Sequence, residues 1–243
     1  MTTVLLLHAY PLSSAMWSAQ LAALQAAGHQ VLTPDHPGFG TVPALDSPSM
    51  DGFALHALRA LDEARVDRAV ICGLSMGGYV AFRILALAPQ RVAGLVFANT
   101  RAEADSDEAR QRRFDQIARI EREGTGWLSE AMLPVLLGPR ANAALRASVQ
   151  AMIAQAPAAG VIGALRAMAG RPSSENLLPV IQVPTAFISG EHDGLTPPAV
   201  MRPMKQQVEG ARCTNLANAG HLSNLESPAV FNQVLLELVD RAS

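Results

Sequence analysis

The stretch Val70-Ile71-Cys72-Gly73-Leu74-Ser75-Met76-Gly77-Gly78-Tyr79 decides how the rest of the chain is interpreted. An apolar, β-rich run leads into Gly-x-Ser-x-Gly, and an apolar helical pattern follows. A sharp turn from strand to helix lifts a serine above the edge of a sheet, and only residues without bulky side chains fit beside it. Gly73 and Gly77 supply that room, so Ser75 is the candidate nucleophile of an acyl transfer. Because such a turn can also serve packing or bind phosphate, the assignment depends on partner residues elsewhere in the chain.

Length and composition favour a well-buried enzyme. The chain has 243 residues, of which 49% are hydrophobic and 16% charged, with a formal net charge of −2. This length suits one large α/β domain, or a core domain with an inserted lid. The near-neutral charge gives no reason to expect nucleic acid or an anionic membrane as a partner. The apolar run Val4 to Leu7 is too short for a signal peptide or a membrane span, which predicts a cytoplasmic protein.

The two cysteines predict neither a disulfide nor a metal site. Cys72 and Cys213 lie in apolar, strand-like stretches without metal-type spacing. We expect both thiols to be buried in the core, and Cys72 to be unreactive although it lies three residues before Ser75. The sequence therefore predicts neither a metal nor another cofactor.

Apolar strand patterns alternate with helical patterns along most of the chain. The predicted strands are Val4 to Leu7, Gln30 to Thr33, Ala69 to Cys72, Val92 to Ala98, Thr185 to Ser189 and Ala211 to Leu216. The predicted helices are Ser14 to Ala27, Met50 to Ala64, Met76 to Ala88, Pro197 to Val208 and Pro228 to Val239. Continuously apolar strands belong in a sheet covered on both faces, which predicts a doubly wound, mainly parallel α/β architecture. Such sheets place their sites at the carboxyl ends of the strands.

The alternation breaks once, from about residue 101 to residue 178. We predict a helical lid, 101–178, inserted in a core domain formed by 1–100 and 179–243. Its first part, Arg101 to Glu123, holds 6 arginines and 7 acids and is interpreted as a solvated helix face rather than an anion site. Apolar residues further on either line a pocket over Ser75 or pack the lid onto the core. The candidate pocket residues are Trp127, Met132, Leu136, Leu137 and Met152 of the lid, together with Leu222.

A base and an acid for Ser75 follow the last two predicted strands. His221 stands in Asn218-Ala219-Gly220-His221-Leu222, after the last strand and before the last helix. Asp193 comes just past Thr185 to Ser189, with Glu191 as its local competitor. Both positions lie at the carboxyl edge of the sheet, and the chain order Ser75, Asp193, His221 is the one this architecture imposes on a catalytic triad. Asp193 would hold the His221 ring in one tautomer and stabilise its protonated form.

Backbone N–H groups near Ser75 are the candidate donors for the oxyanion of a tetrahedral intermediate. One is the N–H of Met76, at the start of a helix whose dipole favours negative charge. The second is the N–H of Tyr10, in the loop His8-Ala9-Tyr10-Pro11 after the first strand, since Pro11 has none.

With these residues assembled, the chain resembles the α/β-hydrolase family nearly from end to end. The turn Asp35 to Gly40 matches the family's Asp-x-x-Gly-x-Gly loop, and Gly190 to Asp193 and Gly220-His221 also fit. Some relatives take their acid after the preceding strand, where this chain reads Asn99-Thr100. Two departures stand out: the usual His-Gly reads His8-Ala9, and the first strand begins too early for the amino-terminal hairpin of many relatives. The resemblance therefore implies a reduced, six-stranded sheet.

Two narrower likenesses suggest a substrate class. The segments Asn99 to Asp105 and Gly220 to Glu226 are similar to those of 3-oxoadipate enol-lactonases, which open a small lactone carrying a carboxylate. Such a group would be bound by Arg101 or another lid arginine. The pair Tyr10-Pro11 resembles that of cofactor-free haloperoxidases, which are esterases with perhydrolysis activity.

The leading hypothesis is a serine hydrolase that cleaves small carboxylic esters or lactones through an acyl-enzyme. The alternatives are a 3-oxoadipate enol-lactonase proper, a carbon–carbon bond hydrolase, and a non-catalytic ligand receptor on the same fold. The expected partner is a small-molecule ester or lactone. Acyl length, stereochemical preference and the formation of a homo-oligomer are left open by the sequence.

Overall fold

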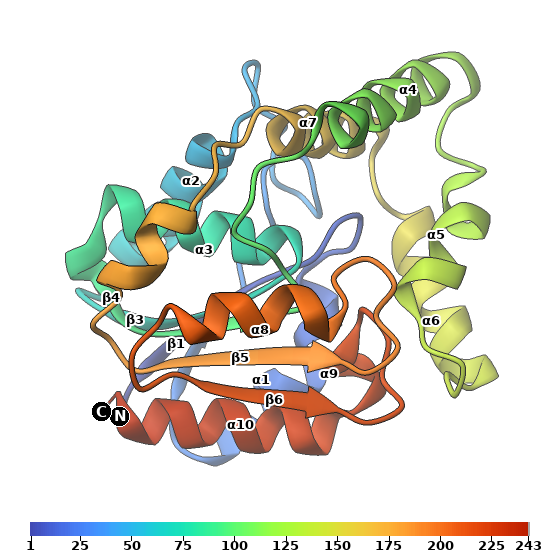
Figure 1. The fold of residues 1–243 in the computed structure, drawn as a ribbon. Helices are drawn as coiled ribbons and strands as arrows, with labels where there is room; N and C mark the ends of the chain where they lie inside the picture. The colour runs from blue at the N-terminus through green and yellow to red at the C-terminus, as the bar shows by residue number, and fades with distance from the viewer. Residues whose placement is uncertain (243) are drawn as a thin grey trace.

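Six parallel strands form the centre of the molecule, in the order β2-β1-β3-β4-β5-β6 (Figure 1). The computed structural model describes residues 1–242. The strands are β1 (Thr3–Leu7), β2 (Gln30–Leu32), β3 (Ala69–Leu74), β4 (Val92–Ala98), β5 (Thr185–Gly190) and β6 (Arg212–Leu216). Strands β1, β3, β4 and β5 consist almost entirely of buried residues, as their unbroken apolar runs predict. The predicted six-stranded doubly wound sheet is confirmed.

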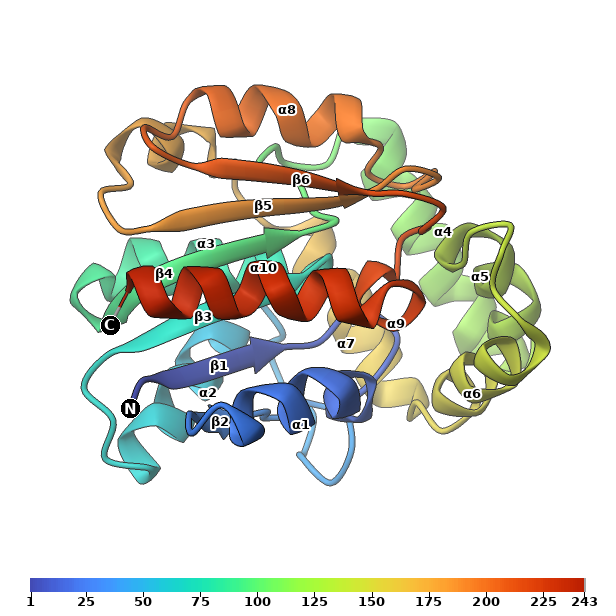
Figure 2. The ribbon, with the colours of Figure 1, turned by 90° about the horizontal axis from the view of Figure 1, so that it is seen from below.

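Helices cover both faces of this sheet (Figure 2). One face is covered by α1 (Ser18–Ala26) and α10 (Pro228–Arg241), and the other by α2 (Met50–Glu63), α3 (Met76–Leu87) and α8 (Pro198–Gln206). Shorter helices lie in the connections: η1 (Ser14–Trp17), η2 (Pro89–Arg91), η3 (Glu175–Val180) and α9 (Ser223–Glu226). Within residues 1–242, no single helix combines the length and apolar character needed to cross a membrane, although two consecutive helices bent by 91° meet those criteria together.

Four α-helices and the short helix η3 follow β4 before the chain returns to the sheet at β5. The α-helices are α4 (Asp107–Glu123), α5 (Leu128–Leu136), α6 (Ala143–Ala154) and α7 (Ala158–Ala169). Figures 1 and 2 both place α5 and α6 beyond the carboxyl ends of the strands, where the arrowheads point. This segment therefore stands over the edge at which parallel sheets form their sites. Its predicted role as a lid, 101–178, over a core of 1–100 and 179–243 stays a prediction.

One expectation about the core is wrong. Cys72 lies fully buried in β3, where burial raises the pKa of its thiol, but Cys213 of β6 is exposed. β6 is one of the two edge strands of the sheet, and its residues Arg212, Cys213 and Asn215 are all exposed. An edge strand has a neighbour on one side only, so apolar patterning alone overestimates its burial.

Candidate active site

Ser75 occupies a strained turn between β3 and α3. Its backbone has φ 56° and ψ −113°, in the region that residues with a Cβ rarely adopt. A Cβ atom added to Gly77 would lie 2.0 Å from the carbonyl oxygen of Leu7, and one added to Gly73 would lie 2.2 Å from that of Gly77. Both glycines are therefore required by close backbone packing. The turn at Ser75 therefore has the tight strand-to-helix geometry that the Gly-x-Ser-x-Gly sequence predicts.

Asp193 and His221 form a hydrogen-bonded pair at the carboxyl edge of the sheet. Asp193 follows β5 and His221 follows β6, and Nδ1 of His221 lies 2.9 Å from Oδ2 of Asp193. The His221 side chain is 2% exposed and that of Asp193 0%. With Nδ1 engaged by the carboxylate, Nε2 is the ring nitrogen left to act as a base. Glu191, the competing acid, instead accepts the N–H of Asn218 at 2.8 Å.

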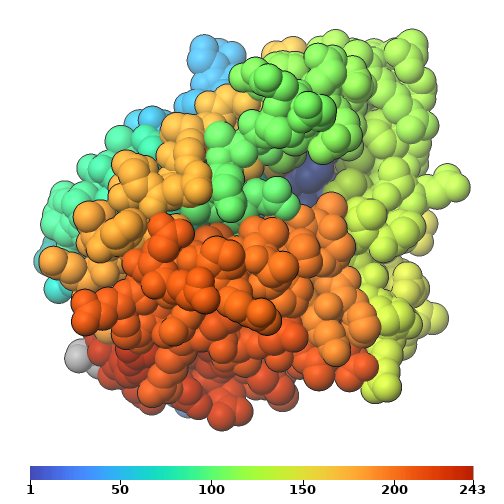
Figure 3. Space-filling view, viewed as in Figure 1, coloured from blue at the N-terminus to red at the C-terminus, as the bar shows by residue number. Residues whose placement is uncertain are grey.

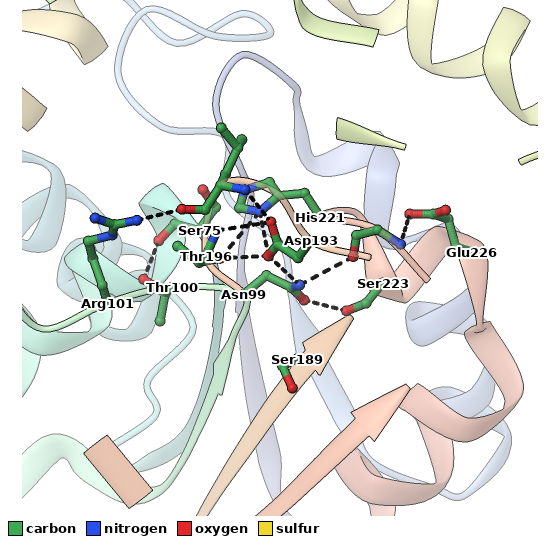
Figure 4. Close-up of polar contacts among 12 residues, drawn as sticks. Ser75, Asn99, Thr100, Arg101, Ser189, Asp193, Thr196, His221, Ser223 and Glu226 are labelled. Atoms are coloured by element: carbon green, nitrogen blue, oxygen red, sulfur yellow. Dashed lines mark hydrogen bonds and ion pairs between the residues drawn. The ribbon is translucent and has the colours of Figure 1, made fainter. Parts of the chain in front are cut away.

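Four further donations hold the Asp193 carboxylate in place. Its Oδ1 accepts the backbone N–H groups of Leu195 and Thr196 at 2.8 and 2.9 Å. Its Oδ2 accepts Oγ1 of Thr196 at 2.6 Å and Nδ2 of Asn99 at 2.8 Å (Figure 4). Burial opposes ionisation of this carboxyl, but the charge and hydrogen bond of His221 and the Thr196 bonds outweigh it and hold the pKa of Asp193 well below its usual value. The acid is therefore ionised and fixed in orientation.

The loop after β1 offers the N–H of Tyr10 beside the turn. The N–H of Ala9 is already engaged by Sδ of Met16 at 3.2 Å, and Pro11 has none. Tyr10 lines the same cavity as Ser75. Met76 is the first residue of α3, and the first-turn N–H groups of a helix lack intrahelical partners. The two predicted oxyanion donors, Tyr10 and Met76, are therefore compatible with the backbone at these positions.

Two buried histidines support this loop. The Nε2 atom of His8 accepts the N–H of His36 at 2.9 Å, and Nε2 of His36 lies 3.1 Å from the carbonyl oxygen of His8. Burial lowers the pKa of His8 to about 4 and holds the pKa of His36 well below its ordinary value. Both rings are therefore neutral at pH 7, and their hydrogen bonds connect the Tyr10 loop to the turn that contains His36.

A cavity of about 510 Å³ opens above Ser75, within the usual range for small-molecule sites. Figure 3 shows the hollow between the green atoms of α4 and the yellow-green atoms of α5, with blue atoms of the N-terminal segment at its bottom. Tyr10, Ser75, Tyr79 and His221 line the cavity, and the loop Gly194 to Thr196 forms part of its wall. The cavity therefore brings the candidate nucleophile and base to one space.

The predicted pocket residues lie largely elsewhere. Met132 lies on the cavity wall, whereas the lining does not include Trp127, Leu136, Leu137, Met152 or Leu222. Leu136, Leu137 and Leu222 are buried, because the end of α5 packs on the His221 loop and the N–H of Leu222 donates to the Leu136 carbonyl at 3.0 Å. Trp127 is covered by the Arg119 guanidinium, 3.9 Å from its ring centroid, and Met152 packs against the core. These five residues therefore fit the alternative, in which they contribute to packing within the insertion or between the insertion and the core.

The charged residues of the cavity are mostly cations. Arg101, Arg112 and Arg113 line it, together with the single carboxylate of Asp105. Arg113 and Arg171 both pair with Asp105, whose Oδ1 lies 2.7 Å from Nη1 of Arg171. Burial opposes the ionisation of Asp105, but these two guanidinium groups hold its pKa below the usual value. The interpretation of residues 101–123 as only a solvated face is therefore incomplete, because one face of α4 borders the cavity.

Tyr10, which lines the same cavity, has a buried hydroxyl group. Tyr10 is 7% exposed, and its hydroxyl oxygen has no hydrogen-bond partner among residues 1–242. Burial raises the pKa of Tyr10, although Arg113 acts in the opposite direction. The phenol is thus a neutral donor, and leaving it unpaired costs about 1–3 kcal/mol.

Sequence reasoning missed several residues at the site. Thr196 and Asn99 bind Asp193, and Arg112 and Arg113 line the cavity. The position of Asn99 directly after a buried strand could have identified it, because the carboxyl ends of parallel strands meet at one edge. The helical arginines carry no comparable signal, since their neighbours depend on how α4 packs.

Comparisons with known proteins agree with this architecture. Residues 2–228 match the sequence pattern of the family described as "alpha/beta hydrolase fold". The structure is similar to that of a thermophilic esterase from Thermogutta terrifontis solved with malate bound, with a TM-score of 0.94, 34% sequence identity, and coverage of 100% of this chain and 90% of that one.

Two related sequences are named for hydrolytic activities. The chain is 31% identical to the "Putative carbamate hydrolase RutD" of Variovorax paradoxus (strain S110), over 95% of this chain and 89% of that protein. It is 27% identical to the 3-oxoadipate enol-lactonase 1 of Acinetobacter baylyi, over 90% of this chain and 81% of that protein. The sequence, the strained serine turn and the sheet topology lead to one conclusion: the chain belongs to the α/β-hydrolase family.

Proposed function

We propose that the protein hydrolyses small carboxylic esters or lactones through an acyl-enzyme, with Ser75 as nucleophile, His221 as base and Asp193 as the acid that orients the base. The observation that carries the proposal is the buried 2.9 Å bond between Nδ1 of His221 and Oδ2 of Asp193, next to a cavity that both Ser75 and His221 line. A serine hydroxyl is a weak nucleophile and needs such a base. The relatives named as an esterase and an enol-lactonase support the same class of reaction.

The proposed reaction has two halves. In the first, Oγ of Ser75 attacks the carbonyl carbon of the substrate and its proton passes to Nε2 of His221. The tetrahedral oxyanion accepts the N–H groups of Tyr10 and Met76, and its collapse expels the alcohol, which takes the proton from His221. In the second half, His221 removes a proton from water, which attacks the carbonyl carbon of the acyl-enzyme. The collapse of this second intermediate breaks the bond to Oγ of Ser75, which takes the proton back from His221 as the acid is released. A lactone gives a single product, because its alcohol and acid are joined.

A Ser75→Ala variant tests this proposal, with Ser148→Ala on the exposed surface of α6 as a matched control. We expect Ser75→Ala to lose nearly all turnover of p-nitrophenyl acetate and Ser148→Ala to keep it. A fluorophosphonate should add to Ser75 in the unaltered protein, as located by peptide mass spectrometry. Full activity of Ser75→Ala would refute the assignment, and ligand binding without turnover would favour the receptor alternative. Turnover of a vinylogous diketone with esters untouched would favour carbon–carbon cleavage.

The cavity also supports a finer proposal: the preferred ester or lactone carries a carboxylate. Arg112 and Arg113 of α4 supply positive charge, and the buried Tyr10 hydroxyl supplies a donor without a protein acceptor. Arginine pairs well with carboxylates, and a partly desolvated pair is screened less than one in water. The enol-lactonase relative and the esterase solved with malate fit this preference.

Two substrates of similar length test the carboxylate. Monoethyl succinate and ethyl butyrate differ in the distal charged group, and we expect a lower KM for the former. Arg112→Leu should raise the KM of monoethyl succinate by about two- to fivefold, the scale of one exposed ion pair, and leave the KM of ethyl butyrate unchanged. Arg122→Leu, at an exposed position of the same helix, is the control. An equal change in the KM of both esters in Arg112→Leu would refute the carboxylate preference, but not the proposed ester or lactone hydrolysis.

A further inference from the structure

The end of strand β4 contacts the segments that carry all three proposed catalytic residues. The carbonyl oxygen of Ala98 accepts the N–H of Ser75 at 2.9 Å, and Oγ1 of Thr100 donates to the carbonyl oxygen of Ser75 at 2.8 Å. Between them, Nδ2 of Asn99 lies 2.8 Å from Oδ2 of Asp193 and 3.3 Å from the carbonyl oxygen of Gly220, which precedes His221. Figure 4 shows Asn99 between the Asp193 side chain and Ser223. Asn99 thus connects the acid and the base loop to the strand that holds the serine turn.

The Asn99 amide uses both of its ends. Its Nδ2 donates to Asp193 and Gly220, while its Oδ1 accepts the hydroxyl of Ser223. Asn99 is 0% exposed. The reversed amide would place an oxygen against the Asp193 carboxylate and the Gly220 carbonyl, both of which are acceptors, so the hydrogen-bond network determines its orientation.

Both the backbone and the side chain at position 99 favour asparagine. The φ of Asn99 is +46°, in the left-handed region where asparagine is several-fold enriched among non-glycine residues. An aspartate would set a second carboxylate against Asp193, and a leucine of similar size would offer neither donor nor acceptor. Hydrogen bonds link Asn99 to three titratable groups: Asp193 directly, His221 through Asp193, and Glu226 through Gly220.

We propose that Asn99 is a positioning residue: it holds the Asp193 carboxylate and the Gly220-His221 backbone in register with the Ser75 turn, through hydrogen bonds to both. Asn99 does not line the cavity, so it acts through Asp193 and not on the substrate. This inference rests on the proposed function, because positioning of this kind has a catalytic effect only if Ser75, Asp193 and His221 act together.

An Asn99→Leu variant tests the inference through its effect on kcat and KM separately. Misplacement of a catalytic group by about 1 Å costs up to about 100-fold, so we expect kcat to fall between about 10-fold and 100-fold with KM within twofold of the unaltered protein. Asn215→Leu is the matched control, because Asn215 is an exposed strand residue that accepts a hydrogen bond from Ser189. Its kcat should stay unchanged.

A double-mutant cycle separates positioning from a general structural role. If Asn99 acts mainly through Asp193, Asn99→Leu should lower kcat in the unaltered background and have a much smaller effect in the Asp193→Ala background, where only its bond to Gly220 is left to lose. For variants whose turnover is too slow to follow, the rate of fluorophosphonate addition to Ser75 measures the remaining reactivity of the serine. Ser223→Ala, which removes only the donor to Oδ1 of Asn99, is a milder second variant for the same cycle should Asn99→Leu fold poorly.

Additive effects in the cycle, or an Asn99→Leu protein with the kcat of the unaltered protein, would overturn the inference. The proposed function would survive that result as long as Ser75→Ala is inactive. Conversely, an active Ser75→Ala protein would refute the proposed function, and the inference about Asn99 would fail with it. The two failures are therefore distinguishable.

Discussion

Acidification is expected to destabilise this protein through the buried pair His8 and His36. Burial lowers the pKa of His8 to about 4, whereas an unfolded histidine titrates near about 6.5. Between these two values the unfolded chain binds the proton that the folded chain excludes. The contribution of neutral His8 to the free energy of unfolding is therefore fully present above about pH 6.5 and is lost as the pH falls toward 4.

The size of the effect follows from the two pKa values. For His8, integrating proton uptake from pH 7.5 down to pH 5 gives a loss of about 2 kcal/mol in the free energy of unfolding. The pKa of His36 is also held well below its ordinary value by burial and by His8, so His36 should add to this loss in the same direction. Glu226, whose pKa burial raises, acts in the opposite direction at the acidic end of this range.

Guanidinium denaturation at pH 7.5, 6.5, 5.5 and 5.0 measures this loss. In a His36→Phe variant, which keeps a ring against Phe53, the loss between pH 7.5 and pH 5.0 should shrink to about 2 kcal/mol because one titrating group is gone. His192→Gln is the control, since the His192 side chain is 42% exposed, and it should retain the full loss. A free energy of unfolding that changes by less than about 0.5 kcal/mol over this range would refute the reasoning.

Three further outcomes can be checked directly. Gly77→Ala would bring a Cβ to 2.0 Å from the Leu7 carbonyl oxygen, so it should lower the free energy of unfolding by about 1–3 kcal/mol, as measured in thermal melts. Gly194→Ala is the control, because no atom lies within 4 Å of its added Cβ, and its effect should be smaller. Equal melting temperatures of the two variants would contradict this expectation. Asp193→Asn should reduce kcat by about 10⁴-fold with p-nitrophenyl acetate, as expected when a base is left in the wrong tautomer, and a loss below tenfold would assign the acid role elsewhere. Met132→Trp should narrow the cavity and reduce the kcat/KM of p-nitrophenyl butyrate more than that of p-nitrophenyl acetate. An equal change in the kcat/KM of both esters would place Met132 away from the acyl group.

The sequence alone predicted the features that depend on local chemistry. Continuous apolar runs indicated all six strands, and Val92–Ala98 was predicted with its observed bounds. Gly73 and Gly77 indicated the tight turn at Ser75, because only glycine fits where a Cβ would meet backbone atoms. The positions of Asp193 and His221 after consecutive strands indicated their pairing, since the carboxyl ends of parallel strands lie at one edge.

Tertiary structure decided which side chains surround that pair. Arg112 and Arg113 border the cavity, while Leu136 and Leu222 are buried in packing between α5 and the His221 loop. The exposure of Cys213 depended on β6 being an edge strand. The bonds from Asn99 to Asp193 and Gly220 join residues 94 and 121 positions apart in the chain. Such contacts depend on the angles at which helices and loops pack, and a pattern of local propensity does not encode those angles.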